Sequence, residues 1–226
     1  MKSLTKEQIE TYVLVIVLYF ITIGLLLSYI DMELYEGFFA VEDGFIEWLT
    51  VAALASSMIL SLKRFFSLKS KPLLFRLCLL GAAGIFFFGI GEEISWGQRI
   101  LGIESPEFFK EHNTQAETNL HNLILGDVRI NKVIFGTGLA ILIIFYMLIL
   151  PPLYSKYERV KKFVSSLAIP LPTQKQVVYY IFLFLAVEAC PSARKGEMLE
   201  FGGSFIFFLT FFNSYNAHIF KNKDSL

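Results

Sequence analysis

The stretch LVIVLYFITIGLLL, from Leu14 to Leu27, decides the fold class because it carries no charged residue and does not alternate apolar with polar positions. A second stretch of this kind, LAILIIFYMLIL, runs from Leu139 to Leu150. A helix needs roughly 20 apolar residues to cross the hydrocarbon core of a bilayer, whereas the strands of a membrane barrel alternate. The pattern therefore predicts transmembrane α-helices.

Outward from these two stretches, the apolar segments divide the chain into about six membrane spans. The spans are expected at roughly 11–30, 45–63, 73–91, 132–152, 176–190 and 200–219, and the fifth is the shortest. The 226 residues are 55% hydrophobic and 18% charged, which is more apolar and less charged than a soluble domain. With no compositional break, the prediction is an all-α, polytopic transmembrane helix bundle that forms one integral membrane domain over residues 1–226.

The distribution of charge predicts the orientation of this bundle. The net charge is +0, so nothing suggests nucleic acid as a partner, but most basic residues fall on one side of the six-span arrangement. That side contains both termini and the connections that hold Lys63, Arg64, Lys69, Lys71, Arg76, Lys156, Arg159, Lys161 and Lys162. Cytoplasmic loops carry such an excess, so both termini are expected in the cytoplasm. The first span reads as a retained helix, because no cleavage-site pattern follows it.

The longest connection, about 92–131, joins the third and fourth spans on the outer side, and long connections are often functional. Ser105, Pro106 and Glu107 resemble an N-cap, a proline at the first helical position and an acid in the first turn. Thr114 to Glu117 fits a capping box, with Gly126 as a stop. Two short interfacial helices are therefore predicted in this outer loop.

The densest polar motif is GEEISWGQR, Gly91 to Arg99, where the third span leaves the membrane. On a continuing helix, Glu92, Trp96 and Arg99 would share one face, with Gln98 beside them. In one interpretation Glu92 pairs with Arg99 and Trp96 anchors the interface. In the other, Glu92 or Glu93 is a metal ligand or a general base, since carboxylates at a membrane edge are costly without such a role.

The second polar motif is ETNLHN, Glu117 to Asn122. Glu117 and His121 are four residues apart, which on a helix lets a carboxylate orient an imidazole or lets both bind one metal. The alternative is a capping glutamate beside an incidental histidine. The complete metalloprotease pattern, H-E-x-x-H, is absent from the chain.

Further acids at the outer ends of the spans could join these motifs. Asp43 suits an N-cap of the second span, with Glu47 in its first turn. Glu188 lies near the outer end of the fifth span and Glu200 begins the sixth, and glutamates inside apolar spans are often functional. Cys78 and Cys190 are expected to be apolar packing residues.

The segments GEEISWGQRILGIESPEFF and ETNLHNL together resemble a family of bacterial multi-pass membrane proteins that carry G-E-E-x-S-W-G-Q-R and N-L-H-N motifs, a family with no assigned activity. The resemblance covers roughly residues 42–125 and implies location in the bacterial plasma (inner) membrane. Carried over by position, it points to Glu47, Glu92, Glu93, Trp96, Gln98, Arg99, Glu117, Asn119, His121 and Asn122.

Three classes of function fit these residues. The first is an enzyme acting on a lipid or lipid-linked substrate, with Glu92, Glu93, Arg99, Glu117 and His121 as catalytic residues. A divalent metal such as Mg²⁺, Mn²⁺, Fe²⁺ or Zn²⁺ would suit that donor set, with Glu92, Glu93, Glu117, His121 and Glu188 as its ligands. The second is a non-catalytic assembly protein whose outer loop docks a membrane partner protein. A transporter fits less well, because the polar residues gather at one face.

Overall fold

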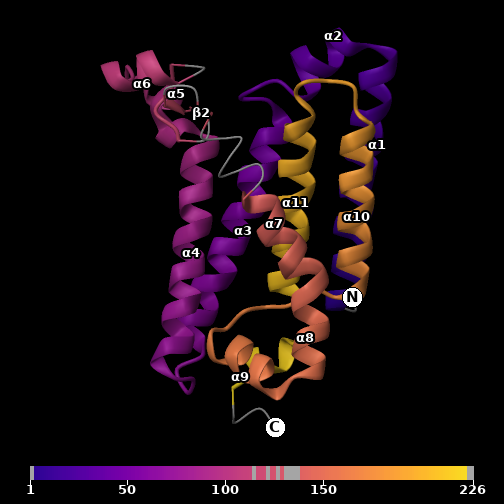
Figure 1. The fold of residues 1–226 in the computed structure, drawn as a ribbon, viewed down its shortest axis with the longest axis vertical. Helices are drawn as coiled ribbons and strands as arrows, with labels where there is room; N and C mark the ends of the chain where they lie inside the picture. The colour runs from indigo at the N-terminus through magenta and orange to yellow at the C-terminus, as the bar shows by residue number, and fades with distance from the viewer. Residues whose placement is uncertain (1–2, 114–115, 121–122, 126–127, 130–137, 223–226) are drawn as a thin grey trace.

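The computed structural model describes residues 3–113, 116–120, 123–125, 128–129 and 138–222. The long helices are α1 (Lys6–Ile30), α3 (Phe45–Ser67), α4 (Leu73–Glu93), α10 (Gln174–Ala189) and α11 (Lys195–Phe212). A further helix runs from α7 (Leu139–Ile144) through the π-helical turn η4 (Phe145–Ile149) into α8 (Leu150–Lys156). All of them lie along the long axis of the molecule (Figure 1).

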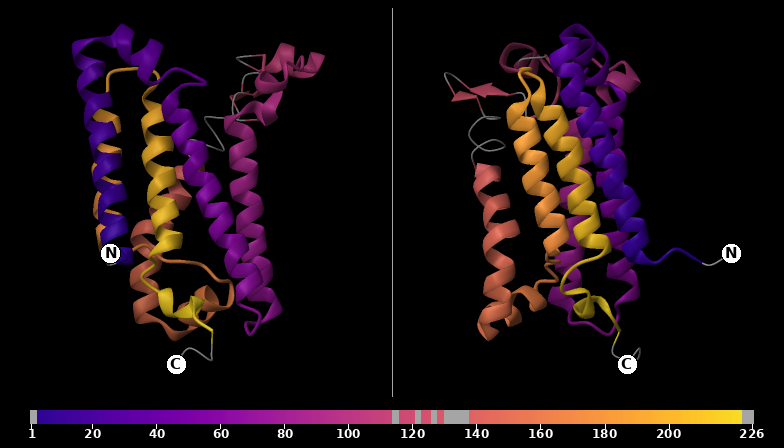
Figure 2. Two further views of the ribbon diagram at one scale, coloured as in Figure 1. Left: turned by 180° about the vertical axis from the view of Figure 1, so that it is seen from behind. Right: turned by 90° about the vertical axis from the view of Figure 1, so that its right-hand side faces the viewer.

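The two ends of the bundle differ, as Figures 1 and 2 show. The first and last described residues lie at one end, here called the terminal end, together with the short helix α9 (Glu158–Ser166). The opposite end, called the cap end, carries α2 (Met32–Leu34), the π-helical turn η1 (Tyr35–Phe39) and the chain that follows α4. Polar side chains gather at both ends, and the two gatherings are built differently.

Four helices are long and apolar enough to cross a membrane, namely α1, α3, α4 and the continuous helix Leu139–Lys156. They agree with the first four predicted spans, although residues 132–137 of the fourth lie outside the described residues. Helices α10 and α11 stand where the fifth and sixth spans are predicted. Helix α10 has only 16 residues, and α11 carries Lys195, Glu197 and Glu200 near its start.

Local sequence signals fix the ends of several helices. Helix α1 begins with a capping box, in which Gln8 N–H donates to Thr5 Oγ1 at 3.2 Å and Thr5 N–H donates to Gln8 Oε1 at 2.9 Å. Helix α10 begins with the same device at Thr173 and Gln176. In the fourth long helix, the π-helical turn η4 precedes Pro151 and Pro152, which have no N–H to donate to the regular helical ladder.

The sixth span was predicted at roughly 200–219, whereas helix α11 runs from Lys195 to Phe212 and so ends before the predicted span does. The chain leaves the helix there to let Asn216 bond another segment. Asn216 Nδ2 donates to Ile169 O at 2.9 Å, and Leu171 N–H donates to Asn216 Oδ1 at 2.9 Å. A short 3-10 helix, η5 (Ala217–Phe220), follows.

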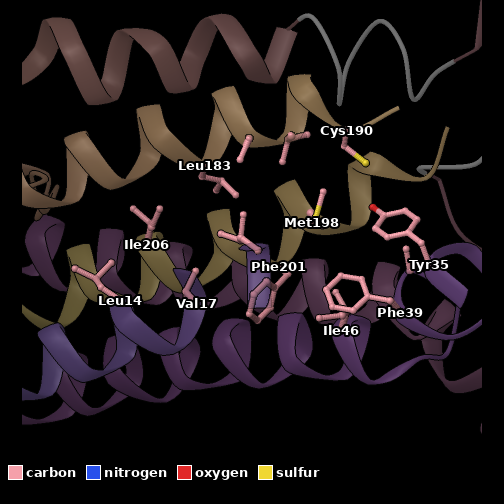
Figure 3. Close-up of a cluster of buried hydrophobic side chains, with 14 of the residues drawn as sticks. Leu14, Val17, Tyr35, Phe39, Ile46, Leu183, Cys190, Met198, Phe201 and Ile206 are labelled. Atoms are coloured by element: carbon pink, nitrogen blue, oxygen red, sulfur yellow. The ribbon is translucent and has the colours of Figure 1, made fainter. Parts of the chain in front are cut away.

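The main apolar core lies where α11 packs against α1, α3 and α10, as the close-up in Figure 3 shows. Phe201, Met198 and Leu183 are fully buried in it. A side chain at Gly202 would come within 2.7 Å of Leu183 Cδ1, so glycine there lets α10 and α11 approach closely. Cys190 is buried in this core and Cys78 is half-buried against a smaller cluster, and neither is in a disulfide.

The apolar surface of the bundle is extensive outside this core. On α4, Ile85 is 73% exposed, and on the fourth long helix Ile141 is 64% exposed. A soluble monomer rarely leaves such contiguous apolar surface open to water. The exposure agrees with helices whose outer faces contact lipid.

The loop after α4 contains a short helix close to the first of the two that were predicted there. Helix α6 (Glu107–His112) begins after Pro106, but Ser105 is not its N-cap, because the helix has no side-chain cap. The second helix is wrong for the residues the structure describes: Ala116 to Leu120 form bends and no helix. Beyond them are two short antiparallel strands, β1 (Ile124–Leu125) and β2 (Val128–Arg129).

Candidate functional site at the cap end

The chain turns back on itself at the end of α4, so the continuing helix on which Glu92, Trp96 and Arg99 would share one face does not form. The helix stops at Glu93, and Ser95, Trp96 and Gly97 follow with φ of 46°, 55° and 77°. Left-handed backbone at consecutive residues, two of them not glycine, is costly and persists only where surrounding contacts enforce it. The turn folds Trp96 over α4, where a side chain at Gly91 would lie 2.8 Å from Trp96 Cε3. Trp96 also contacts the rings of Phe87 and Phe88 edge-on.

Glu92 is the central acceptor of this turn, and it is only 5% exposed. Trp96 Nε1 donates to Glu92 Oε1 at 3.0 Å, and the backbone N–H of Leu120 donates to Glu92 Oε2 at 2.7 Å. Hydrogen bonds to an ionised carboxylate are among the stronger ones in proteins. Glu92 therefore ties α4 both to its own turn and to a loop 28 residues further along the chain.

Glu117 and Asn119 join the same turn from the loop side. Ser95 Oγ donates to Glu117 Oε2 at 2.5 Å, and Asn119 Nδ2 donates to Ser95 Oγ at 3.0 Å. Ser95 is fully buried and Asn119 is 2% exposed. Glu117 lies between two bends and not in a helix, so the structure does not give it the helical position from which its spacing to His121 was argued. His121 and Asn122 themselves lie outside the described residues.

Gln98 makes a third connection between the turn and the loop. Its Nε2 donates to Ser105 Oγ at 2.6 Å, and the backbone N–H of Thr118 donates to its Oε1 at 2.8 Å. Ser105 Oγ in turn donates to Ala116 O at 2.6 Å, so this hydroxyl belongs to the connection and does not cap α6, whose N-cap is Pro106. Described residues 94–113 and 116–120 thus form one hydrogen-bonded unit over the end of α4, here called the cap.

A second group of acids lies at the cap end on three different helices. Glu47 of α3 and Glu200 of α11 lie close enough to Glu93 of α4 and to Glu197 of α11 to interact with them electrostatically. Glu47 is 7% exposed, and its Oε2 accepts the backbone N–H of Asp43 at 2.7 Å. Gly44 is the N-cap of α3, so the predicted N-cap role of Asp43 is wrong. Glu197 was not among the predicted site residues, although it lies one turn before Glu200, and that spacing was a signal in the sequence.

Glu188 is a member of the predicted metal site that the structure places elsewhere. Its Oε2 lies 3.1 Å from Lys195 Nζ in an ion pair whose glutamate side chain is 53% exposed. This contact joins the end of α10 to the start of α11. Glu188 therefore forms an ion pair at the surface, where α10 connects to α11.

The metal prediction depends partly on His121, which the structure does not describe. The catalytic prediction includes Arg99, whose side chain is also outside the described part of the structure. Among the described residues, no three histidine, cysteine, aspartate or glutamate side chains are grouped so that they could hold a metal ion. The metal site remains a sequence prediction. What the structure does bring together is Glu92 with Trp96, and Glu117 with Ser95 and Asn119.

A small pocket opens between the cap and α4, with a volume of about 280 Å³. Its walls are largely apolar, and Glu92 contributes to them. The apolar residues at its edge are Phe88, Trp96, Phe109 and Leu120. Such a pocket suits an apolar group that approaches at the surface of the bundle.

Comparison with known proteins adds no relative to this description. No protein-family model matches the chain, and no curated protein and no solved structure resembles it. The function of this chain is therefore inferred from its own residues.

Proposed function

We propose that this chain is a multi-pass protein of the bacterial plasma membrane whose cap docks a membrane partner protein without catalysing a reaction. One observation carries this proposal: both carboxylate oxygens of Glu92 hold the cap onto α4. The most prominent acid of the predicted catalytic set thus has a mechanical role. Glu117 also accepts within the cap, on its Oε2, from Ser95 Oγ and Asn119 Nδ2.

The proposal includes the finer topology. We take α10 and α11 as the fifth and sixth spans, because they pack along α1 within the same core. If they did not cross the bilayer, the polar backbone groups at their ends would lie inside lipid. The basic connections at the terminal end, together with the positive-inside rule, favour a cytoplasmic terminal end. The cap then faces the outer side, and membership of the bacterial family with the GEExSWGQR motif is part of this proposal.

A partner contact would use the pocket beside Glu92. Phe109 lines it and Trp96 stands at its edge with 45% of its surface exposed. Aromatic side chains around a pocket are common anchoring points in protein interfaces. The left-handed turn at Ser95–Gly97 gives this surface a fixed shape, which reduces the entropic cost of docking.

The test is site-specific photocrosslinking in native membranes, with the photoreactive residue in place of Phe109. A docked partner gives one discrete protein adduct, and the adduct disappears when Glu92→Gln loosens the cap. The same residue placed at Ile85, on the exposed face of α4, should give lipid adducts only. The matched control is Glu104→Gln, whose side chain is 87% exposed; it should keep the adduct. Lipid adducts alone at position 109 would contradict docking.

A second candidate function is an enzyme that acts on a lipid or lipid-linked substrate. The observation that favours it is the group of Glu47, Glu93, Glu197 and Glu200 from three helices, since like-charged acids gathered at a membrane edge often serve chemistry. Here Glu93→Gln would change the lipid composition of the cells while the protein still folds. In the docking proposal, the same variant leaves the lipids unchanged.

A further inference from the structure

Arg64 occupies an unusual position at the terminal end of α3. It is only 8% exposed, and its guanidinium carbon lies 3.9 Å from the centre of the Phe220 ring. Its Nη1 is buried and has no hydrogen-bond acceptor. Among the described residues, no carboxylate forms an ion pair with it.

Within the part of the chain that the structure describes, this arrangement leaves a permanent charge without a paired carboxylate. A guanidinium stays protonated at all relevant pH values, and buried charges are normally paired and hydrogen-bonded. The face of one aromatic ring offsets only part of that cost. The nearby acid on α1, Glu10, is committed elsewhere, because its two oxygens accept from Gln176 Nε2 and Asn213 Nδ2 at 2.7 Å each.

A second polar atom at this end is in the same condition. Ser214 Oγ is buried and has no hydrogen-bond partner among the residues that the structure describes. Ser214 lies between α11 and η5, in the C-terminal segment that brings Phe220 over Arg64. Two buried donors with no acceptor, supplied by two segments that meet, indicate a missing acceptor.

The charges around Arg64 indicate whether the missing group is negatively or positively charged. The Arg64 charge repels the ammonium of Lys6, which is held nearby by a bond from its Nζ to Phe212 O at 3.2 Å. Arg76 and Lys71 stack on the rings of Phe65 and Phe75 at the same end. The site is therefore electropositive and would be stabilised by an anion.

We propose that Arg64, Ser214 and Lys6 form a binding site for a phosphate group at the terminal end of the bundle. A guanidinium offers paired donors that match phosphate oxygens, the serine hydroxyl adds a donor, and the lysine adds charge. The phosphate belongs either to the headgroup of an anionic phospholipid in the adjacent leaflet or to free phosphate from solution. The ring of Phe220, in the four-residue helix η5, lies against the guanidinium.

The test measures thermal unfolding of the full chain in a neutral detergent. In one arm, inorganic phosphate is added; in the other, dioctanoyl-phosphatidylglycerol, with dioctanoyl-phosphatidylcholine and sodium chloride as controls. A bound anion raises Tm with concentration, by roughly 5 °C near saturation. A shift with phosphatidylglycerol alone identifies the headgroup, a shift with phosphate alone identifies free phosphate, and a shift with both supports the site from either source.

The variants assign the shift to this site. Arg64→Met keeps an apolar stem under Phe220 and should abolish the shift, whereas Lys63→Met, at the adjacent exposed lysine, should keep it. If Arg64→Met does not fold, Ser214→Ala removes only a hydroxyl and should weaken apparent affinity by about tenfold, the loss of one hydrogen bond to a charged group. Equal shifts in the parent and these variants, or no shift in either arm, would overturn the proposal.

Discussion

Two buried glutamates, one at each end of the bundle, show how differently the same side chain can be used. Glu10 is 3% exposed and Glu92 is 5% exposed. Each receives a hydrogen bond on both carboxylate oxygens. The donors to Glu10 are the side-chain amides of Gln176 and Asn213, whereas those to Glu92 are an indole and a loop backbone N–H.

The difference lies in what each carboxylate connects. Glu10 links α1 to the start of α10 and the end of α11, so its bonds join regular helices that already pack together. Glu92 holds an irregular segment whose left-handed turn has little other support than the contacts of the cap. Loss of Glu10 should therefore weaken the whole bundle, and loss of the Glu92 contacts should release the cap while the helices stay in place.

The largest expected effect is the loss of the Glu10 connection. Glu10→Ala leaves Asn213 Nδ2 and one bond of Gln176 without an acceptor in a buried site, which should cost about 3 kcal/mol of unfolding free energy. Thermal unfolding in detergent, followed by far-ultraviolet circular dichroism, measures it. Glu7→Ala, at an exposed residue of the first turn of α1, is the matched control and should change little. A similar loss of unfolding free energy in both variants would show that the negative charge near the start of α1, and not the buried connection of Glu10, stabilises the bundle.

A smaller, local effect is expected at the turn over α4. Gly91→Ala would place a methyl group 2.8 Å from Trp96 Cε3, which forces the indole away from Glu92 at a cost of about 1–3 kcal/mol. Gly81→Ala on the same helix meets nothing within 4 Å and serves as its control.

Tryptophan fluorescence and limited proteolysis of the cap separate the two glycine variants. Gly91→Ala should shift the emission of Trp96 and speed cleavage in the cap, while the Tm of the bundle stays near that of the parent protein. If Gly91→Ala instead lowered the bundle Tm as much as Glu10→Ala does, the cap would be part of the cooperative core, and the contrast between the two ends would fail.

The same contrast explains how much the sequence could predict. Apolar length alone predicted the helices that fit a membrane, because a span is a local property of about 20 residues. The capping boxes at Thr5 and Thr173 are also local and readable. The end of the sixth span was missed, because the chain stops at Phe212 to let Asn216 bond Ile169 and Leu171, and those partners are far away in sequence.

The cap shows the limit most clearly. The motif at Glu92, Trp96 and Gln98 was recognised as a polar site, but the spacing of its residues was interpreted as that of a continuing helix. Positive φ at Ser95 and Trp96 is disfavoured locally and is enforced by the bonds of Ser95 to Glu117 and Asn119. Those bonds cross more than 20 residues of chain, so no local rule could predict them. Whether the residues carry chemistry is still a prediction.

The smallest expected effect concerns Glu104, which is an acid of the cap that lies at its surface. Its Oε2 is 2.8 Å from Lys110 Nζ, and this hydrogen bond and the lysine charge hold the pKa of Glu104 below its ordinary value. A depressed carboxyl pKa contributes stability at neutral pH that is lost as the pH falls through the folded-state pKa. Both side chains face water, so solvent and salt screen the pair.

We therefore expect Glu104→Gln to leave the Tm of the protein unchanged at pH 7 and in high salt. The parent and the variant should respond equally to a titration from pH 7 to pH 4. A clear loss in Glu104→Gln alone would mean that surface charge, and not the buried bonds of Glu92, holds the cap on α4.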